Sequence, residues 1–208
     1  FDPVVAAEWR NARLDFDTLP DLLRSLVETP GTRGLKLAAP ALDETLLRRA
    51  MADEDVKRIS RSRGAVMRLW EACQLPDFQK TTLDEHARLS KEIFQALTGP
   101  RGRLTADWIA PRFAQLDRDD GQIDQLSARL AGVRTLSYIA NRADWLDQAR
   151  DWRDQTRVLE ERLSDVLRTS PPRWPRTAGS RSRARWSAIW TGCASPRTRA
   201  APPWPTAH

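Results

Sequence analysis

Residues 63–76 have the sequence RGAVMRLWEACQLP, which contains the clearest helical pattern in the chain. Its large apolar residues recur every three or four positions, at Val66, Leu69, Trp70 and Cys73. This spacing places all four on one face of an α-helix, whereas a strand would alternate with a period of two. Pro76 ends the pattern, because proline cannot continue a helix. The stretch therefore predicts a helix over 63–75 with one buried stripe.

Similar signals extend from the start of the chain to about residue 168. Thr82 is followed three residues later by Glu85, which is typical of a capping box, and Thr105 is expected to begin a helix in the same manner. No segment shows a convincing period-two alternation, so strands are not expected. We predict helices over 3–10, 18–28, 43–52, 63–75, 82–97, 105–116, 123–142 and 151–168. Pro111 should kink or shorten its helix. The predicted fold class is all-α, a multi-helix orthogonal bundle with a disordered C-terminal tail.

Charge separates the chain into a body, residues 1–168, and a tail, residues 169–208. The tail holds seven of the 34 Lys and Arg residues and none of the 28 Asp and Glu residues, so the body has 27 basic and 28 acidic residues. The net charge of +6 and the pI of about 10.1 of the whole chain therefore result from the basic tail. They do not identify the body as a nucleic-acid binder.

The composition of the tail is unusual for a folded or a disordered segment. It contains seven prolines and four tryptophans, with Ile189 as its only large aliphatic residue. Such a segment cannot bury enough apolar surface to fold. Shifting the reading frame by one base can turn Trp186 and Trp190 into leucines. We therefore expect either a frameshift product or a genuine basic tail that binds nucleic acid.

The sequence lacks the residue patterns that most catalytic mechanisms require. There is no phosphate-binding P-loop motif, and His86 and His208 have no partners at ligand spacing. Cys73 lies on an apolar stripe and is expected in the core. Residues 117–121 resemble a calcium loop but lack its glycine and glutamate spacing. We predict no catalytic residue, no metal site and no cofactor in this chain.

One basic cluster in the body could contact phosphates. No acidic residue occurs between Asp55 and Glu71, a segment that contains Lys57, Arg58, Arg61, Arg63 and Arg68. Arg101 and Arg103 form a weaker second candidate. Alternatively, the cluster is a solvated loop that balances the acidic residues 53–55. Four aromatic residues could stack on bases but are more typical of helix packing: Trp108, Tyr138, Trp145 and Trp152.

Several blocks in the body resemble one family of enzymes. Residues 69–80, LWEACQLPDFQK, are similar to a segment of bacterial helicases of the mitochondrial degradosome RNA helicase family, in the DExH-box superfamily 2. Similar blocks occur, in the same order, at residues 8–16, 97–109, 116–124, 138–145 and 162–165. The resemblance implies that residues 1–168 are the all-helical C-terminal accessory region of such a helicase. Its RecA-like motor domains, which bind ATP and Mg, are not in this chain.

The resemblance sets the functional expectation. This region would pack against the motor domains of the parent helicase and contact single-stranded RNA or DNA without catalysing a reaction by itself. The alternative is a helical protein-interaction scaffold that does not bind nucleic acid. No apolar stretch is long enough to span a membrane and no signal peptide is expected at the N-terminus, so the predicted location is the cytoplasm.

Overall fold

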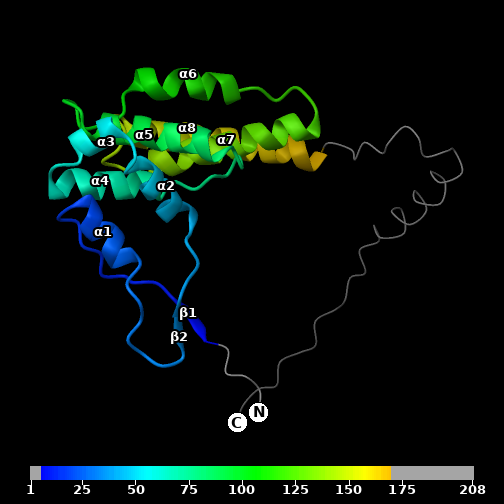
Figure 1. The fold of residues 1–208 in the computed structure, drawn as a ribbon. Helices are drawn as coiled ribbons and strands as arrows, with labels where there is room; N and C mark the ends of the chain where they lie inside the picture. The colour runs from blue at the N-terminus through cyan, green and yellow to red at the C-terminus, as the bar shows by residue number, and fades with distance from the viewer. Residues whose placement is uncertain (1–5, 170–208) are drawn as a thin grey trace, which may run out of the picture. The chain divides into compact units, whose positions relative to one another are not determined.

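The computed structural model describes residues 6–169 of the 208-residue chain (Figure 1). These residues form eight α-helices and two short β-strands. In chain order they are β1 (Ala7–Trp9), α1 (Leu19–Leu26), β2 (Leu35–Leu37), α2 (Leu42–Ala50), α3 (Glu54–Ile59), α4 (Arg63–Cys73), α5 (Leu83–Thr98), α6 (Ala106–Leu116), α7 (Ile123–Asn141) and α8 (Ala149–Thr169). The all-α class is confirmed. The expected disorder and frameshift origin of the tail fall, from residue 170 on, outside the described residues.

The helix α4 supplies the centre of the larger core, as its apolar stripe predicts. Val66, Leu69, Trp70 and Cys73 are all buried, with at most 6% of any of these residues exposed. Helices α2 and α5 pack against α4. Fully buried residues from later helices, including Phe94 and Ile139, belong to the same core. One apolar core therefore joins segments that are distant in the sequence.

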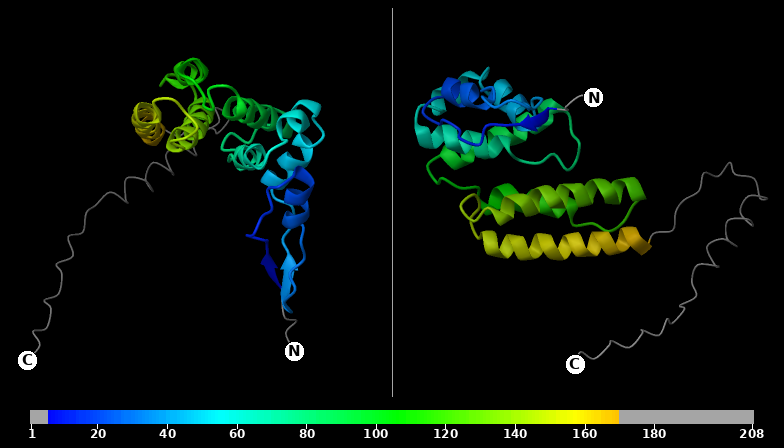
Figure 2. Two further views of the ribbon diagram at one scale, coloured as in Figure 1. Left: turned by 90° about the vertical axis from the view of Figure 1, so that its left-hand side faces the viewer. Right: turned by 90° about the horizontal axis from the view of Figure 1, so that it is seen from below.

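A second, smaller core lies between the two longest helices. Helix α8 runs alongside α7 (Figure 2). Their facing stripes supply four buried residues to this core: Leu126, Val133, Leu159 and Leu163. The short connection, residues 142–148, makes the two helices antiparallel neighbours.

The start of α5 has the capping interactions that its sequence predicts. Thr82 Oγ1 accepts a hydrogen bond from the Glu85 amide at 3.3 Å, and Glu85 Oε2 accepts one from the Thr82 amide at 3.1 Å. Thr105 occupies the same position before α6, but its side chain makes no capping hydrogen bond. The expectation that both threonines act in the same manner is therefore wrong.

The expected helix at the start of the chain is wrong for its described residues. Residues 6–10 are not helical, because Ala7–Trp9 pairs in parallel with Leu35–Leu37, with Ala7 opposite Leu35. A strand of three residues is too short to show alternation, and its partner lies far along the chain, so neither strand was expected. Of the two effects expected of Pro111, shortening does not occur, because helix α6 continues through Pro111 to Leu116.

The short helix α3 was not predicted either. The carboxylate of Asp53 caps it by accepting from the amides of Asp55 at 3.0 Å and Val56 at 3.3 Å. Val56 anchors the helix in the core with 1% of its surface exposed. Lys57 and Arg58 therefore lie in the last turn of a helix and not in a loop. Of the helices in 6–169, none combines the length and the apolar character needed to cross a membrane.

Candidate nucleic-acid interface

The first candidate cluster spans α3, the turn after it and the first half of α4. Lys57 and Arg58 end α3, Arg61 lies in the turn, and Arg63 and Arg68 lie on α4. Ser62, which lies between α3 and α4, caps the start of α4. Its hydroxyl accepts a hydrogen bond from the Ala65 amide at 3.2 Å.

Two of these cations are paired within their own helix. Lys57 Nζ lies 2.7 Å from Glu54 Oε1, and Arg58 Nη2 lies 2.7 Å from Asp55 Oδ1. Both pairs join residues three positions apart, where side chains on a helix meet. The acidic first turn of α3 therefore balances the charge of its basic last turn.

Arg63 and Arg68 pair with carboxylates from other parts of the chain. Arg63 Nη1 lies 2.6 Å from Oδ1 of Asp17, just before α1. Arg68 Nη1 lies 2.8 Å from Glu71 Oε2 and also pairs with Asp144, in the connection between α7 and α8. The hydrogen bond to Asp144 raises the pKa of Arg68, and the same bond lowers the pKa of Asp144. Both arginines thus join segments that are distant in the sequence.

Arg61 differs from the other four members of the cluster. Its side chain is exposed and has no hydrogen bond or ion pair with any described residue. It lines an open hollow of about 380 Å³ together with Lys57, Arg58 and the acidic residues Glu54 and Asp55. The structure therefore leaves one uncompensated cation in the first cluster.

Arg101 and Arg103 lie on the short turn between α5 and α6, and both are exposed. Within residues 6–169 neither side chain has an ionic or hydrogen-bond partner. The end of the turn is fixed, because the buried Leu104 donates to the Trp145 carbonyl at 2.7 Å and accepts from the Asp147 amide at 3.0 Å. Gly102 has a φ of +65°, which glycine adopts without strain. The two arginines are thus displayed on an anchored turn.

The aromatic candidates pack within the protein, as their helical spacing favoured. Trp145 is fully buried and meets Tyr138 edge to face at 6.4 Å. Trp152 packs edge to face against Phe113 at 5.7 Å. Trp108 lies beneath Arg112, whose guanidinium carbon is 4.1 Å from the ring centre. Their rings contribute to packing and cation–π contacts.

His86 and Cys73 have structural surroundings. His86 is buried, and its Nε2 lies 2.9 Å from the Leu75 carbonyl oxygen. Burial raises the pKa of the Cys73 thiol to about 12, so the thiol stays neutral at physiological pH. Across residues 6–169, no three His, Cys, Asp or Glu side chains gather in a group that could hold a metal ion.

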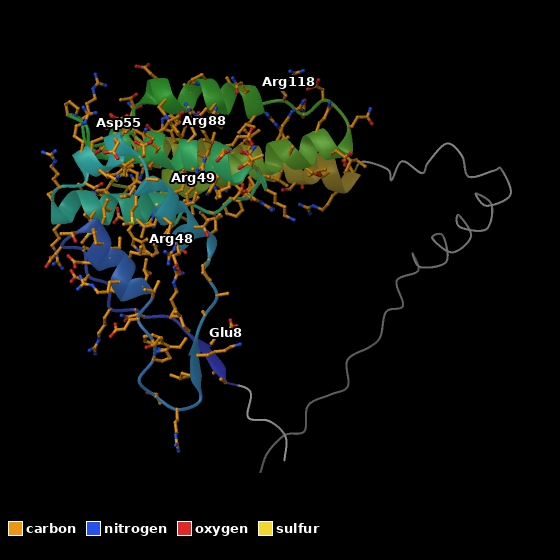
Figure 3. The ribbon with its side chains drawn as sticks, in the orientation of Figure 1. Glu8, Arg48, Arg49, Asp55, Arg88 and Arg118 are labelled. Atoms are coloured by element: carbon orange, nitrogen blue, oxygen red, sulfur yellow. The ribbon has the colours of Figure 1, made fainter. Side chains whose placement is uncertain are left out.

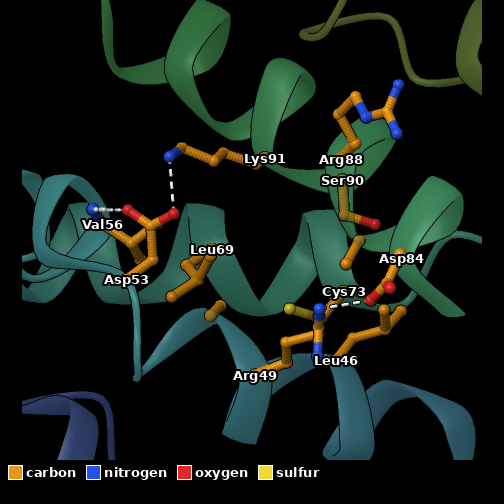
Figure 4. Close-up of a pocket in the computed structure, with 12 residues that line it drawn as sticks. Leu46, Arg49, Asp53, Val56, Leu69, Cys73, Asp84, Arg88, Ser90 and Lys91 are labelled. Carbon is orange, nitrogen blue, oxygen red and sulfur yellow. Dashed lines mark hydrogen bonds and ion pairs between the residues drawn. The ribbon is translucent and has the colours of Figure 1, made fainter.

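Sequence reasoning missed a further group of cations around α5. Arg49 on α2 and Arg88 on α5, both labelled in Figure 3, line one pocket together with Lys91 of α5, whose side chain reaches Asp53 (Figure 4). Arg88 and Lys91 are three residues apart, which places them on one side of a helix. Arg49 is distant in the sequence, so only the packing of α2 on α5 shows that it belongs to the group.

Comparison with known proteins gives no identification. No protein-family model, no curated protein and no solved structure matches this chain.

Proposed function

We propose that the body of this chain is an accessory, nucleic-acid-contacting C-terminal region of an ATP-dependent RNA or DNA helicase. The support is the ordered resemblance of its sequence blocks to that family, together with exposed arginines that the fold leaves unpaired. Its partners are the RecA-like motor domains of the parent protein and single-stranded RNA or DNA. ATP and Mg bind in the motor domains, and the body has no catalytic residue. A cytoplasmic location is part of the same proposal.

The observation that carries this proposal is the different state of the seven candidate cations. Arg61, Arg101 and Arg103 are exposed and have no partner among residues 6–169, whereas the other four are ion-paired. An unpaired arginine can bind a phosphate without first breaking an internal ion pair. The proposed contact is therefore limited to a few phosphates, and binding should be weak and sensitive to salt.

The second candidate function is a helical protein-interaction scaffold that does not touch nucleic acid. The ion pairs of Lys57, Arg58, Arg63 and Arg68 favour it, because they neutralise most of the first basic cluster. If removing the three unpaired arginines leaves the nucleic-acid binding of the chain unchanged, that result would support this alternative for the body.

The experiment is a titration of labelled single-stranded RNA at low salt with the full chain. The variant R61A/R101A/R103A should bind at least about tenfold more weakly, because each phosphate contact is charge-assisted. The matched control R13A/R150A/R153A removes three arginines that are also exposed and also unpaired within the described residues. Equal affinity of both variants would contradict the proposed interface. The arginines of the tail are present in every protein and cancel in the comparison.

A further inference from the structure

The three arginines of the proposed interface lie on two turns at one end of the helical bundle. Helix α4 packs against α5, and the short connection over residues 74–82 makes the two helices antiparallel neighbours. The turn before α4, which carries Arg61, therefore lies where α5 ends and the turn with Arg101 and Arg103 begins (Figures 1 and 2). The fold thus brings two turns that are distant in the sequence to the same end.

The connection between α7 and α8 holds these two turns in place. Asp144 in this connection pairs with Arg68 on α4. The carbonyl of the next residue, Trp145, accepts a hydrogen bond at 2.7 Å from the amide of Leu104, which directly follows Arg103. Trp145 and Leu104 are both buried. The separation of the two turns is therefore set by contacts within the protein.

The separation suits one strand of nucleic acid. Residues 61–68 contribute about 10 Å at the rise of a helix, and the step across the connection to Leu104 contributes about 10 Å more. A stacked single strand has one phosphate about every 3.4 Å, so roughly six nucleotides span the distance from Arg61 to Arg103. A strand of about twelve nucleotides can therefore reach both turns, whereas a trinucleotide can reach only one.

The surface between the turns has little net charge. Two arginines there interact with two carboxylates, in a set made up of Arg68, Arg142, Glu71 and Asp144. Asp107, in the first turn of α6, and Asp147, in the connection, add negative charge close to the second turn. Binding therefore depends on where the unpaired arginines lie and not on a large excess of positive charge.

We infer that one single strand of RNA or DNA crosses this end of the bundle and binds both turns at the same time. The inference rests on the proposed nucleic-acid interface. One phosphate binds Arg61, and phosphates roughly six nucleotides along the strand bind Arg101 and Arg103. A strand held at one turn stays close to the other turn, so the two contacts strengthen each other. Two separate molecules, one on each turn, would not show this coupling.

The test is amide NMR of the full chain, titrated at low salt with a uridine dodecamer and with a uridine trinucleotide. The Gly102 amide reports on the second turn. R61A should weaken dodecamer binding measured at Gly102 at least about twofold, because the strand loses its contact at the first turn. The same substitution should leave trinucleotide binding at Gly102 unchanged. The arginines of the tail are present in every sample and cannot produce this difference.

The matched control is R33A, which removes an arginine that is also exposed and also unpaired within residues 6–169. R33A should change neither titration. If R61A leaves dodecamer binding at Gly102 unchanged while R101A/R103A weakens it, the shared strand is overturned and the proposed interface stands. If neither R61A nor R101A/R103A changes RNA binding, the proposed interface fails, and the shared strand fails with it.

Discussion

Arg68 on α4 pairs with Asp144, which lies 76 residues further along the chain in the connection between α7 and α8. The same guanidinium holds Glu71 on its own helix at 2.8 Å. Within the described part of the chain, this arginine therefore links the larger core to the α7–α8 pair. Arg68, a candidate phosphate contact from the sequence, is thus ion-paired with two carboxylates of the protein itself.

Removing Arg68 should destabilise the protein more than removing an arginine from an exposed local pair. R68A should lower the free energy of unfolding by about 1 kcal/mol, because two carboxylates lose their partner. R58A breaks only the exposed pair with Asp55, and its effect should stay below about 0.5 kcal/mol. Urea denaturation of the two variants provides the comparison. Equal losses would show that the contact with Asp144 adds nothing.

The pair should also contribute to the pH dependence of stability. The hydrogen bond from Arg68 lowers the pKa of Asp144 below its ordinary value of 3.8. A group with a lowered folded-state pKa stabilises the fold above its unfolded pKa, and this stabilisation is lost as the pH falls through the folded pKa. D144N should therefore cost about 0.5–1 kcal/mol at pH 7 and progressively less below about pH 4. Denaturation at pH 7 and in acid tests this. A cost that is constant with pH would contradict it.

The two helix-capping threonines offer a matched pair of substitutions. T82A removes the acceptor of the Glu85 amide, which is one half of the capping box, and should cost about 1 kcal/mol. T105A removes a side chain that makes no capping hydrogen bond, so its cost should be less than half of that. The readout is the midpoint of thermal unfolding. A larger effect of T105A would be inconsistent with the described caps.

Two helical glycines should respond in opposite directions to alanine. A Cβ at Gly64 on α4 meets nothing within 4 Å, so G64A should stabilise the protein by about 0.5 kcal/mol through helix propensity. A Cβ at Gly132 on α7 would lie 2.8 Å from Cδ2 of Leu116, on α6. G132A should therefore lower stability by about 1 kcal/mol despite the same gain in propensity. Stabilisation by both substitutions would show that Leu116 moves aside freely.

The longer helices could be predicted from the sequence because their signals are local. The capping box at Thr82 and the apolar stripe from Val66 to Cys73 depend on residues within one or two turns. The parallel pairing of Ala7 with Leu35 and the capping of α3 by Asp53 left no comparable periodic signal. The two strands and helix α3 are short elements, and their tertiary contacts fix them in place.

The candidate site could be predicted only as a set of basic residues. Whether each cation is paired depends on contacts that spacing does not show, such as Arg63 with Asp17 and Arg68 with Asp144. The pairs of Lys57 and Arg58 follow helical spacing but required α3 to be recognised as a helix. In the structure, Arg61, Arg101 and Arg103 are the candidates without an ion pair among residues 6–169, and the proposal rests on these three.

The most direct test of the proposed interface is the salt dependence of RNA binding. For a single strand, the slope of log K against log salt changes by about 0.7 for each phosphate contact. If Arg61, Arg101 and Arg103 each bind one phosphate, R61A/R101A/R103A should flatten the slope of the full chain by about 2, with unchanged far-UV circular dichroism. The control R13A/R150A/R153A should leave the slope within about 0.5 of the parent value. Equal slopes for both variants would contradict nucleic-acid contact by these three arginines and favour the scaffold.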